Sequence, residues 1–312
     1  MTLEALSRRI KTTADLRKIV STMKMLSSVS VTQYERALLS IKEFGETVRE
    51  GFLGVLLHDE FYFQPQEIKT PRPKTLIVVI GTDNGLVGRF NREALAHAAR
   101  SAAGNAVRLI CVGKKMGLLA HARKYAIDDV YAISNSLKEI ITLASMILVK
   151  INAVIAREKI EKVVLCFNQR AGASVKPTAQ QLIPLPLPKY RELKKKKWDG
   201  PTIPMIAGDN QRVFQALIHE YFTVSLTHAL TSSLAAEHYT RMMNMQQAEK
   251  NIDESLDAMN LEYQQMRQAR ITDELIDIVS GAESLKTGHP LTKEPKKAKR
   301  RRTHKRSKND KI

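Results

Sequence analysis

Residues 246–280 have the sequence QQAEKNIDESLDAMNLEYQQMRQARITDELIDIVS, which closes a stretch of 72 residues, 209–280, without glycine or proline. Proline costs about 3 kcal/mol inside a helix and glycine about 1 kcal/mol. One helix over this stretch would be roughly 108 Å long at about 1.5 Å per residue. A rod of that length cannot bury its apolar stripe on itself. The stretch therefore predicts a long helix that pairs with another helix.

The other end of the chain offers that partner. Residues 1–44 also lack glycine and proline, and apolar residues recur over 1–58 at spacings that alternate between three and four, with a phase shift near 10–16. Three glycines predict a weakening or bend late in this helix, and Gly281 is the predicted C-cap of the second helix, over 209–285. The predicted seams comprise Leu3, Leu6, Ile10, Leu16, Ile19, Met23, Leu26, Val31, Tyr34, Leu38, Ile41, Val48, Phe52 and Val55 on the first helix, and Met245, Ala248, Ile252, Leu256, Met259, Tyr263, Met266, Ala269, Ile276 and Val279 on the second.

The middle of the chain has a different texture. Short β-branched runs at 76–81, 107–113 and 162–167 alternate with helical patterns at 91–103, 114–124 and 137–157, and residues 170–208 suggest an irregular return or an edge strand. Alternating strands and helices predict a largely parallel sheet. The predicted fold class is therefore α/β. An antiparallel coiled coil of the long N- and C-terminal helices, 1–58 and 209–285, grows out of a central Rossmann-like α/β domain, 74–208.

Charge and cysteine content bound the function classes. The net charge is +18, but residues 286–312 hold 12 lysines and arginines against 2 acids, so this segment carries +10 of it. Such a run cannot bury surface and predicts a disordered basic tail. The two cysteines lie in apolar strand-like runs, which is typical of reduced thiols inside a cell. No signal peptide is expected, and the longest apolar run, 143–149, is too short to span a bilayer.

Catalytic chemistry has no convincing candidate in this sequence. The segment GTDNGLVG (81–88) follows a strand, but its glycine spacing is neither that of a dinucleotide loop nor that of a Walker A loop, so a structural turn is favoured. The histidines show no metal-binding spacing, and no carboxylate pair or Ser/His/Asp group stands out. We therefore expect no catalytic residue, no cofactor and no metal site.

Three segments carry a resemblance to a known family. RRIKTTADLRKIVSTMKMLSS (8–28), GTDNGLVGRFN (81–91), and AAEHYTRMMNMQQAEKNIDESL (235–256) with RQARITDELIDIVSGAESL (267–285) resemble the gamma subunit of the rotary F-type ATP synthase, in the right order over 1–285. The resemblance implies a non-catalytic rotor shaft. It couples ion flow, of protons or sodium, through a membrane ring of c subunits to ATP synthesis and hydrolysis at the beta subunits.

The resemblance also implies partners and contact residues. The helical hairpin stands inside the hexamer of alpha and beta subunits, the α/β domain sits on the c-subunit ring with the epsilon subunit, and the membrane is contacted through the ring only. The expected location is the cytoplasmic face of the bacterial inner membrane. Met23 and Lys24 match the MKM position that meets the beta subunits, and Arg267, Gln268 and Thr272 match the RQAxIT segment. Ile276, Val279 and Ala282 approach an apolar sleeve near the shaft's tip.

Some features depart from the family pattern. Val87 stands where the family often has cysteine, residues 193–208 do not match the usual lead into the last helix, and the basic tail is additional. These departures indicate a divergent branch, such as the alternative bacterial synthases. Two rival classes are a coiled-coil nucleic-acid-binding protein that uses the tail, and a nucleotide-dependent α/β enzyme that uses the 81–88 loop. No specific nucleic acid is expected, because the tail lacks interleaved aromatic residues.

Overall fold

The computed structural model describes residues 2–57, 73–102, 107–134, 136–185, 202 and 205–286. The chain divides into two compact units, one of residues 1–13 with 255–312 and the other of residues 14–254. The predicted basic tail lies outside the described residues from 287 onward. Two long helices take part in both units: α1 (Leu3–Leu57) and α6 (Asn210–Lys286).

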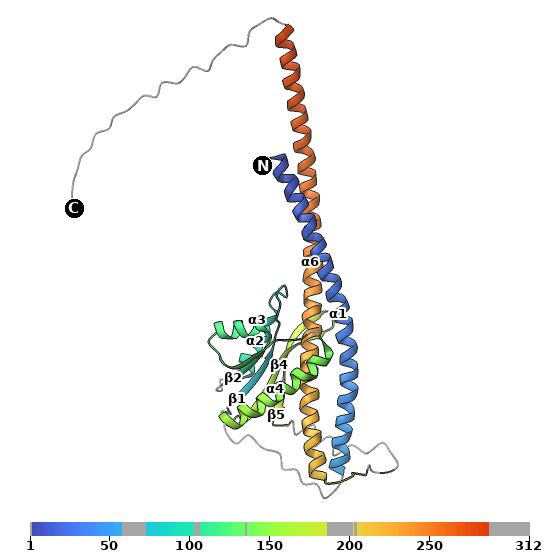
Figure 1. Ribbon diagram of the computed structural model, residues 1–312, viewed down its shortest axis with the longest axis vertical. Helices are drawn as coiled ribbons and strands as arrows, with labels where there is room; N and C mark the ends of the chain where they lie inside the picture. The colour runs from blue at the N-terminus through green and yellow to red at the C-terminus, as the bar shows by residue number, and fades with distance from the viewer. Residues whose placement is uncertain are drawn as a thin grey trace, which may run out of the picture. The chain divides into compact units, whose positions relative to one another are not determined.

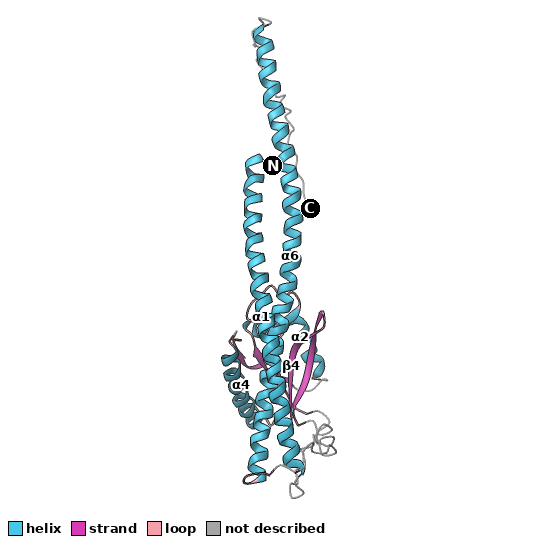
Figure 2. Ribbon diagram, turned by 90° about the vertical axis from the view of Figure 1, so that its right-hand side faces the viewer, coloured by secondary structure: helices cyan, strands magenta, loops and turns pink. Residues whose placement is uncertain are grey.

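Within residues 14–254, α1 and α6 run antiparallel (Figures 1 and 2). Arg17 forms an ion pair with Asp253, and Lys24, further along α1, pairs with the earlier residue Glu249. Near the end of α1, Gly51 lies against Leu217. Later residues of α1 thus meet earlier residues of α6, which confirms the predicted hairpin.

The glycines of these helices behave differently from the sequence prediction. Helix α1 continues without interruption through residues 45–54, so the three glycines do not end it, and the bend stays a prediction. A Cβ on Gly51 would lie 2.8 Å from Cδ2 of Leu217, so this glycine lets the two helices approach closely. Gly281 is not a C-cap either, because α6 continues to Lys286. One glycine costs about 1 kcal/mol, which does not end a helix whose flanking residues are good helix formers.

The predicted seam of α1 is wrong over part of its length. Leu16, Ile19 and Leu26 are 50%, 56% and 64% exposed. Further along α1 the buried residues are Ser27, which lies outside the predicted seam, and Val31 and Tyr34, which belong to it. Opposite the earlier part of α1, α6 carries the acids Glu249 and Asp253, which form ion pairs with Lys24 and Arg17. The side of α1 with these two basic residues therefore faces α6, and Leu16, Ile19 and Leu26 are left exposed.

The α/β domain is a five-stranded sheet in the order β3-β2-β1-β4-β5. The first four strands are parallel, and β5 is antiparallel to β4. The sequence did not predict β3. It predicted an irregular return or an edge strand over 170–208, and β5 is that edge strand. The strands are β1 (Thr75–Ile80), β2 (Val107–Val112), β3 (Ala126–Tyr131), β4 (Lys162–Ala171) and β5 (Ser174–Ile183).

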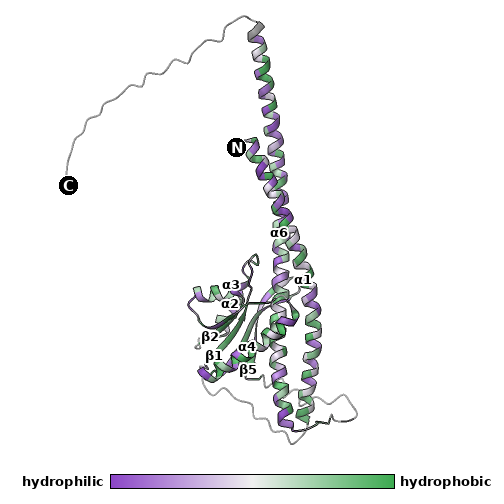
Figure 3. Ribbon diagram, in the orientation of Figure 1, coloured by the Kyte–Doolittle hydropathy of each residue, from purple (hydrophilic) through white to green (hydrophobic). Residues whose placement is uncertain are grey.

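Helices cover both faces of this sheet, as the buried strands require. On one face, α2 (Phe90–Ser101) and α3 (Lys114–Ala122) pack on Ile77 and Val79 of β1. On the other face, α4 (Leu137–Glu158) and the middle of α6 pack on Leu76, Val78 and Ile80. In Figure 3 the strands near the β1 and β2 labels are accordingly coloured as hydrophobic, whereas hydrophobic and hydrophilic residues alternate along the long helices.

Helix α4 is long and apolar enough to cross a membrane, with a mean hydropathy of 1.9 in its best window. Seven of its residues, however, belong to the core that it shares with the sheet and α6. Packing on the domain accounts for these seven residues, whereas Ile141, Met146 and Val149 are 53%, 52% and 70% exposed.

Candidate functional site

The 81–88 loop lies at the carboxyl end of β1, the edge where Rossmann-like sheets bind ligands. In this chain the carboxylate of Asp83 accepts the backbone hydrogen bonds at this edge that a bound anion could otherwise accept. Asp83 accepts hydrogen bonds from the backbone N–H of Lys114, the first residue of α3, at 2.7 Å, and of Ile133 at 3.2 Å. Because a helix N-terminus is a natural anion site, Asp83 fills the position that a phosphate would need.

Thr82, beside Asp83, is also hydrogen-bonded within the chain, whereas residues 84–86 are exposed. The Thr82 N–H donates to Oδ1 of Asn91 at 3.1 Å, and the Asn91 amide donates to the Thr82 hydroxyl at 2.9 Å. Gly113 has φ +104°, and a Cβ there would lie 2.6 Å from the backbone nitrogen of Thr82. Next to it, Val87, Phe90 and Ala236 form an apolar cluster. The loop is thus a packed junction, and its geometry favours the structural turn over a nucleotide site.

Helix α6 holds this junction with polar side chains. The Asn244 amide donates to the carbonyl of Leu86 at 3.0 Å, and the Arg241 guanidinium lies 3.5 Å from the carbonyl of Gly85. A second contact involves Tyr239, whose hydroxyl donates to the carbonyl of Ala173 at 3.3 Å. Ala173 lies in the turn between β4 and β5, so one short segment of α6 reaches two separate loops.

Arg170 adds a further link at the β4–β5 turn. Its guanidinium lies 4.3 Å from the centre of the Tyr239 ring and forms an ion pair with Glu35 of α1. A cation over an aromatic ring is attracted by the ring's negative face. Arg170 therefore ties the turn to α6 and α1 together.

A buried ion pair lies beside these contacts. Glu237 and Arg241 are 4% and 7% exposed, and the guanidinium lies 2.5 Å from Oε1 of Glu237. Burial raises the pKa of Glu237, and the charge of Arg241 opposes that rise. Burial, with the charge of Arg241, lowers the pKa of His238 to about 4, so its ring is neutral where it stacks on Tyr34, 5.5 Å between centroids.

The two residues of the MKM position lie on α1 near this pair. Met23 is half-buried and lines a hollow of about 400 Å³ together with Ser27, Leu86 and Arg241. The Lys24 ammonium is engaged within the chain by Glu249, and its hydrogen bond lowers the pKa of the Glu249 carboxyl. Sequence reasoning placed Lys24 at a partner surface; in the chain itself it also holds α1 to α6.

The predicted contact residues of the RQAxIT segment lie on α6 in the other unit. Arg267, Gln268 and Thr272 are exposed, and the Thr272 hydroxyl donates to the backbone carbonyl of Gln268 at 3.0 Å. Ile276 and Val279 are 56% and 57% exposed. Within the described part of the chain, Arg267 forms no ion pair, so its donors are free for a partner.

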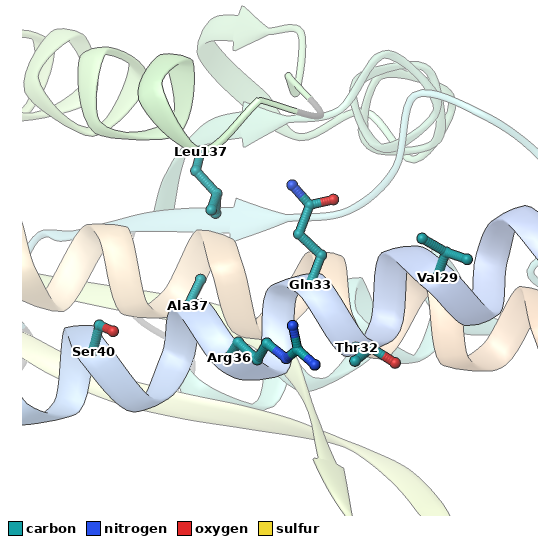
Figure 4. A pocket seen from close by; sticks show the side chains of 7 residues that line it. All are labelled: Val29, Thr32, Gln33, Arg36, Ala37, Ser40 and Leu137. Atoms are coloured by element: carbon teal, nitrogen blue, oxygen red, sulfur yellow. The ribbon is translucent and has the colours of Figure 1, made fainter.

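A second hollow and two buried thiols are further candidate sites of chemistry among the described residues. The hollow in Figure 4, about 630 Å³, runs along α1 from Val29 to Ser40 beside Leu137 of α4, and Arg36 is its one charged residue. Among the described residues no group of three or more His, Cys, Asp or Glu could hold a metal ion. Burial raises the pKa of Cys111 and of Cys166 to about 12, so neither thiol is a nucleophile near neutral pH.

A family model for ATP synthase matches residues 2–285. The chain belongs to the ATP synthase family. It is 26% identical to the ATP synthase gamma chain of Nitratiruptor sp. (91% of this chain, 99% of that one), and 28% identical to the gamma chain of Christiangramia forsetii (91% and 98%). The match to gamma chains over nearly their whole length confirms the resemblance drawn from the three sequence segments.

Solved structures agree in fold with this gamma subunit. A chain from the Euglena gracilis mitochondrial ATP synthase OSCP/F1/c-ring structure has a TM-score of 0.65 at 17% identity, with 96% of this chain and 98% of that chain covered. A chain from the Tetrahymena thermophila central stalk/c-ring structure has a TM-score of 0.53 at 22% identity, with 74% and 99% covered. At these identities the likeness concerns the fold alone.

Sequence reasoning missed the polar grip of α6 on the α/β domain. The segment RMMNM (241–245) entered the prediction only as part of the family-like stretch 235–256, whereas in the structure its Arg241 and Asn244 contact the loop after β1. A signal was present in the sequence: two polar residues, three apart, among methionines place both side chains on one face. Nothing in the sequence names the loop that they meet.

Proposed function

We infer that this gamma subunit is the central-stalk rotor of an F-type ATP synthase, non-catalytic itself, which couples ion flow through the c-subunit ring to ATP synthesis and hydrolysis at the beta subunits by rotation. The family match and the gamma-chain relatives support this role. The fold supports it as well. A helical hairpin without interior breaks is stiff and can transmit rotation. The 81–88 loop, which is bonded within the chain, favours a structural role over nucleotide binding.

The observation that carries the proposal is the exposed aliphatic surface of the long helices. On α6 the large apolar side chains Leu275, Ile276, Ile278 and Val279 are each at least half exposed, and on α1 Leu16, Ile19 and Leu26 are as well. Extended apolar surface on a soluble helix marks a partner interface. A shaft enclosed by a ring of other subunits accounts for such surface on several sides of one helix.

Individual contacts follow from the resemblance and from chemistry. Arg267 and Gln268 would donate to carboxylates or carbonyls of beta-subunit loops, with Thr272 beside them, because charge-assisted hydrogen bonds are the stronger ones. Met23 and Lys24 would meet the beta subunits, and Ile276 and Val279 the apolar sleeve. The alpha, beta and epsilon subunits and the c ring are the proposed partners, at the cytoplasmic face of the bacterial inner membrane.

The alternative, a coiled-coil nucleic-acid-binding protein with a basic tail, has no support in the comparisons. Its charge is concentrated in residues 286–312, and such binding would fade steeply with salt. DNA binding retained by residues 1–285 would favour this alternative.

Affinity purification of the full chain from its own cells tests the rotor role. We expect alpha, beta, epsilon and c-type subunits to be isolated with it. The control is a chain with Ile276→Asp and Val279→Asp, which should fold but lose part of the hexamer. Absence of every synthase subunit from the wild-type preparation would overturn the proposal.

A further inference from the structure

Three side chains of α6 attach the α/β domain from two sides. Tyr239 reaches the carbonyl of Ala173, whereas Arg241 and Asn244 reach the carbonyls of Gly85 and Leu86. With about 3.6 residues per turn, Tyr239 and Arg241 project about 160° apart around the helix, and Asn244 lies about 60° from Arg241. The two attachments therefore lie on opposite sides of the axis of α6.

The apolar contact of α6 with the domain lies just before these attachments. Between 225 and 237 α6 buries small side chains such as Ala229 and Ala235 beside Leu226, Leu230 and Leu234, which belong to the core shared with the sheet and α4. Within the described chain, the hydroxyls of Ser232 and Ser233 make no hydrogen bond. Burial of apolar area is non-directional, so hydrogen bonds supply the directional part of this attachment.

Hydrogen bonds at fixed points away from the helix axis resist rotation of α6 about that axis. Because the Tyr239 and Asn244 bonds leave α6 on opposite sides, a turn of α6 would distort both of them. The loops that receive these bonds are themselves held. Asp83 anchors the first loop to α3 and to Ile133, and Arg170 anchors the second to Glu35.

We propose that Tyr239, Arg241 and Asn244 form a two-sided clamp, named here the α6 clamp, which transmits torsion between the α/β domain and α6. They act as positioning residues, through the loops that they hold. The torsional role rests on the proposed rotor function, whereas the attachment itself is a property of the single chain.

The first test uses the full chain alone. The double variant Tyr239→Phe with Asn244→Asp keeps both shapes and removes both donors. We expect amide exchange in residues 82–90 and 171–175 to become about tenfold faster, because local opening depends on such contacts. The matched control is Tyr263→Phe with Asn260→Asp, the same changes on α6 away from the α/β domain. Unchanged exchange at both loops in the clamp variant would overturn the clamp.

The second test uses the assembled synthase with its hexamer fixed to a surface and a bead on the α/β domain. In the clamp variant we expect the angular variance of the stalled bead to rise roughly twofold as local attachment is lost. The rate of ATP hydrolysis should match that of the control. An assembled complex whose variance does not change would overturn the torsional role and leave the rotor function standing. A wild-type chain that joins no synthase would overturn the rotor function, and the torsional role with it.

Discussion

Oε1 of Glu237 lies 2.5 Å from the guanidinium of Arg241, one helical turn further along α6, and both side chains are buried. The pair lies where α6 meets both α1 and the 81–88 loop, since Arg241 also approaches the carbonyl of Gly85 and His238 stacks on Tyr34. Breaking a buried pair leaves one charge without compensation, which is far more costly than exchanging both residues for apolar ones.

Arg241→Met should therefore destabilise the chain by about 3–5 kcal/mol. The pKa of Glu237 is already raised by burial, and the loss of Arg241 raises it further. The folded state then binds a proton that the unfolded state releases, so the free energy of unfolding should fall as the pH rises through the raised pKa. The slope would be at most about 1.4 kcal/mol per pH unit for one proton. Urea unfolding between pH 5 and pH 8 measures it, because this range lies above the ordinary Glu pKa of about 4.3, where a raised carboxyl pKa takes effect.

The control for this prediction is the double variant Glu237→Gln with Arg241→Met. It removes both charges, so most of the stability and the flat pH profile should return. A single variant whose stability did not depend on pH would show that Glu237 is not buried as an acid.

Gly45→Ala and Gly51→Ala form a matched pair on α1. A Cβ at Gly45 would lie 3.5 Å from Val224, an ordinary contact, so the alanine should stabilise the chain by about 1 kcal/mol through helix propensity. At Gly51 the Cβ would lie 2.8 Å from Leu217, and the packing strain should outweigh that gain by about 1 kcal/mol. Thermal unfolding of the two variants compares them directly, and equal shifts would contradict the close approach at Gly51.

Asp128 on the edge strand β3 should govern part of the acid stability. Its side chain is 2% exposed, and a hydrogen bond from Arg108 lowers its pKa, with Arg157 adding to the effect. A carboxyl group whose pKa is lowered in the folded state stabilises the fold at pH values above its unfolded pKa of about 3.9. This stabilisation is lost as the pH falls through the folded-state pKa. Arg108→Met should cost about 1–3 kcal/mol at pH 7 and weaken the pH dependence below about pH 4.

Arg157→Met is the control for Arg108, because Arg157 is 56% exposed and its contribution is screened by water. Its effect on acid unfolding should be the smaller one. A larger effect of Arg157→Met than of Arg108→Met would contradict the conclusion that the Arg108 hydrogen bond contributes more to the lowered pKa of Asp128.

Arg267→Ala with Gln268→Ala should reduce ATP-driven ion pumping or assembly of the synthase. Both residues are exposed on α6, and a charged hydrogen bond to a partner contributes about 1.5–3 kcal/mol. Pumping by inverted membrane vesicles, divided by ATP hydrolysis, gives the coupling. The matched control is Arg270→Ala, whose guanidinium already pairs with Glu274 at 3.0 Å. Wild-type coupling and assembly in the double variant would remove these residues from the contact.

Truncation after Leu285 should leave ATP hydrolysis unchanged, since the basic segment 286–312 is additional to the family pattern. Its +10 charge would attract acidic surfaces at low salt, and ions screen such attraction. Hydrolysis by complexes with and without 286–312, at low and high salt, is the measurement. A large, salt-sensitive change on truncation would instead identify the tail as a brake that binds acidic beta-subunit loops.

The sequence by itself determined the long helices, their pairing and the family. Each of these depends on information that is local or periodic: the absence of glycine and proline over 209–280, the apolar repeats, and the motifs near 23, 81 and 267. Three of the strands of the sheet were predicted for the same reason, because buried parallel strands are continuous apolar runs. Strand β3, with Asp128 and Asp129, was missed because its acids are balanced by Arg108 and Lys150 from other elements.

Only the tertiary structure decided which side of each helix meets which partner. The aliphatic row of Leu16, Ile19 and Leu26 follows the spacing of a seam, yet it faces outward, because Glu249 and Asp253 of α6 select Lys24 and Arg17 instead. In the α6 clamp, likewise, each side chain of α6 bonds to a backbone carbonyl more than sixty positions away in the sequence. Every residue has a backbone carbonyl, so the sequence cannot indicate which one is bound. Periodicity fixes how a helix turns along its own length, whereas the rotation of one helix against another depends on contacts that only the folded chain brings together.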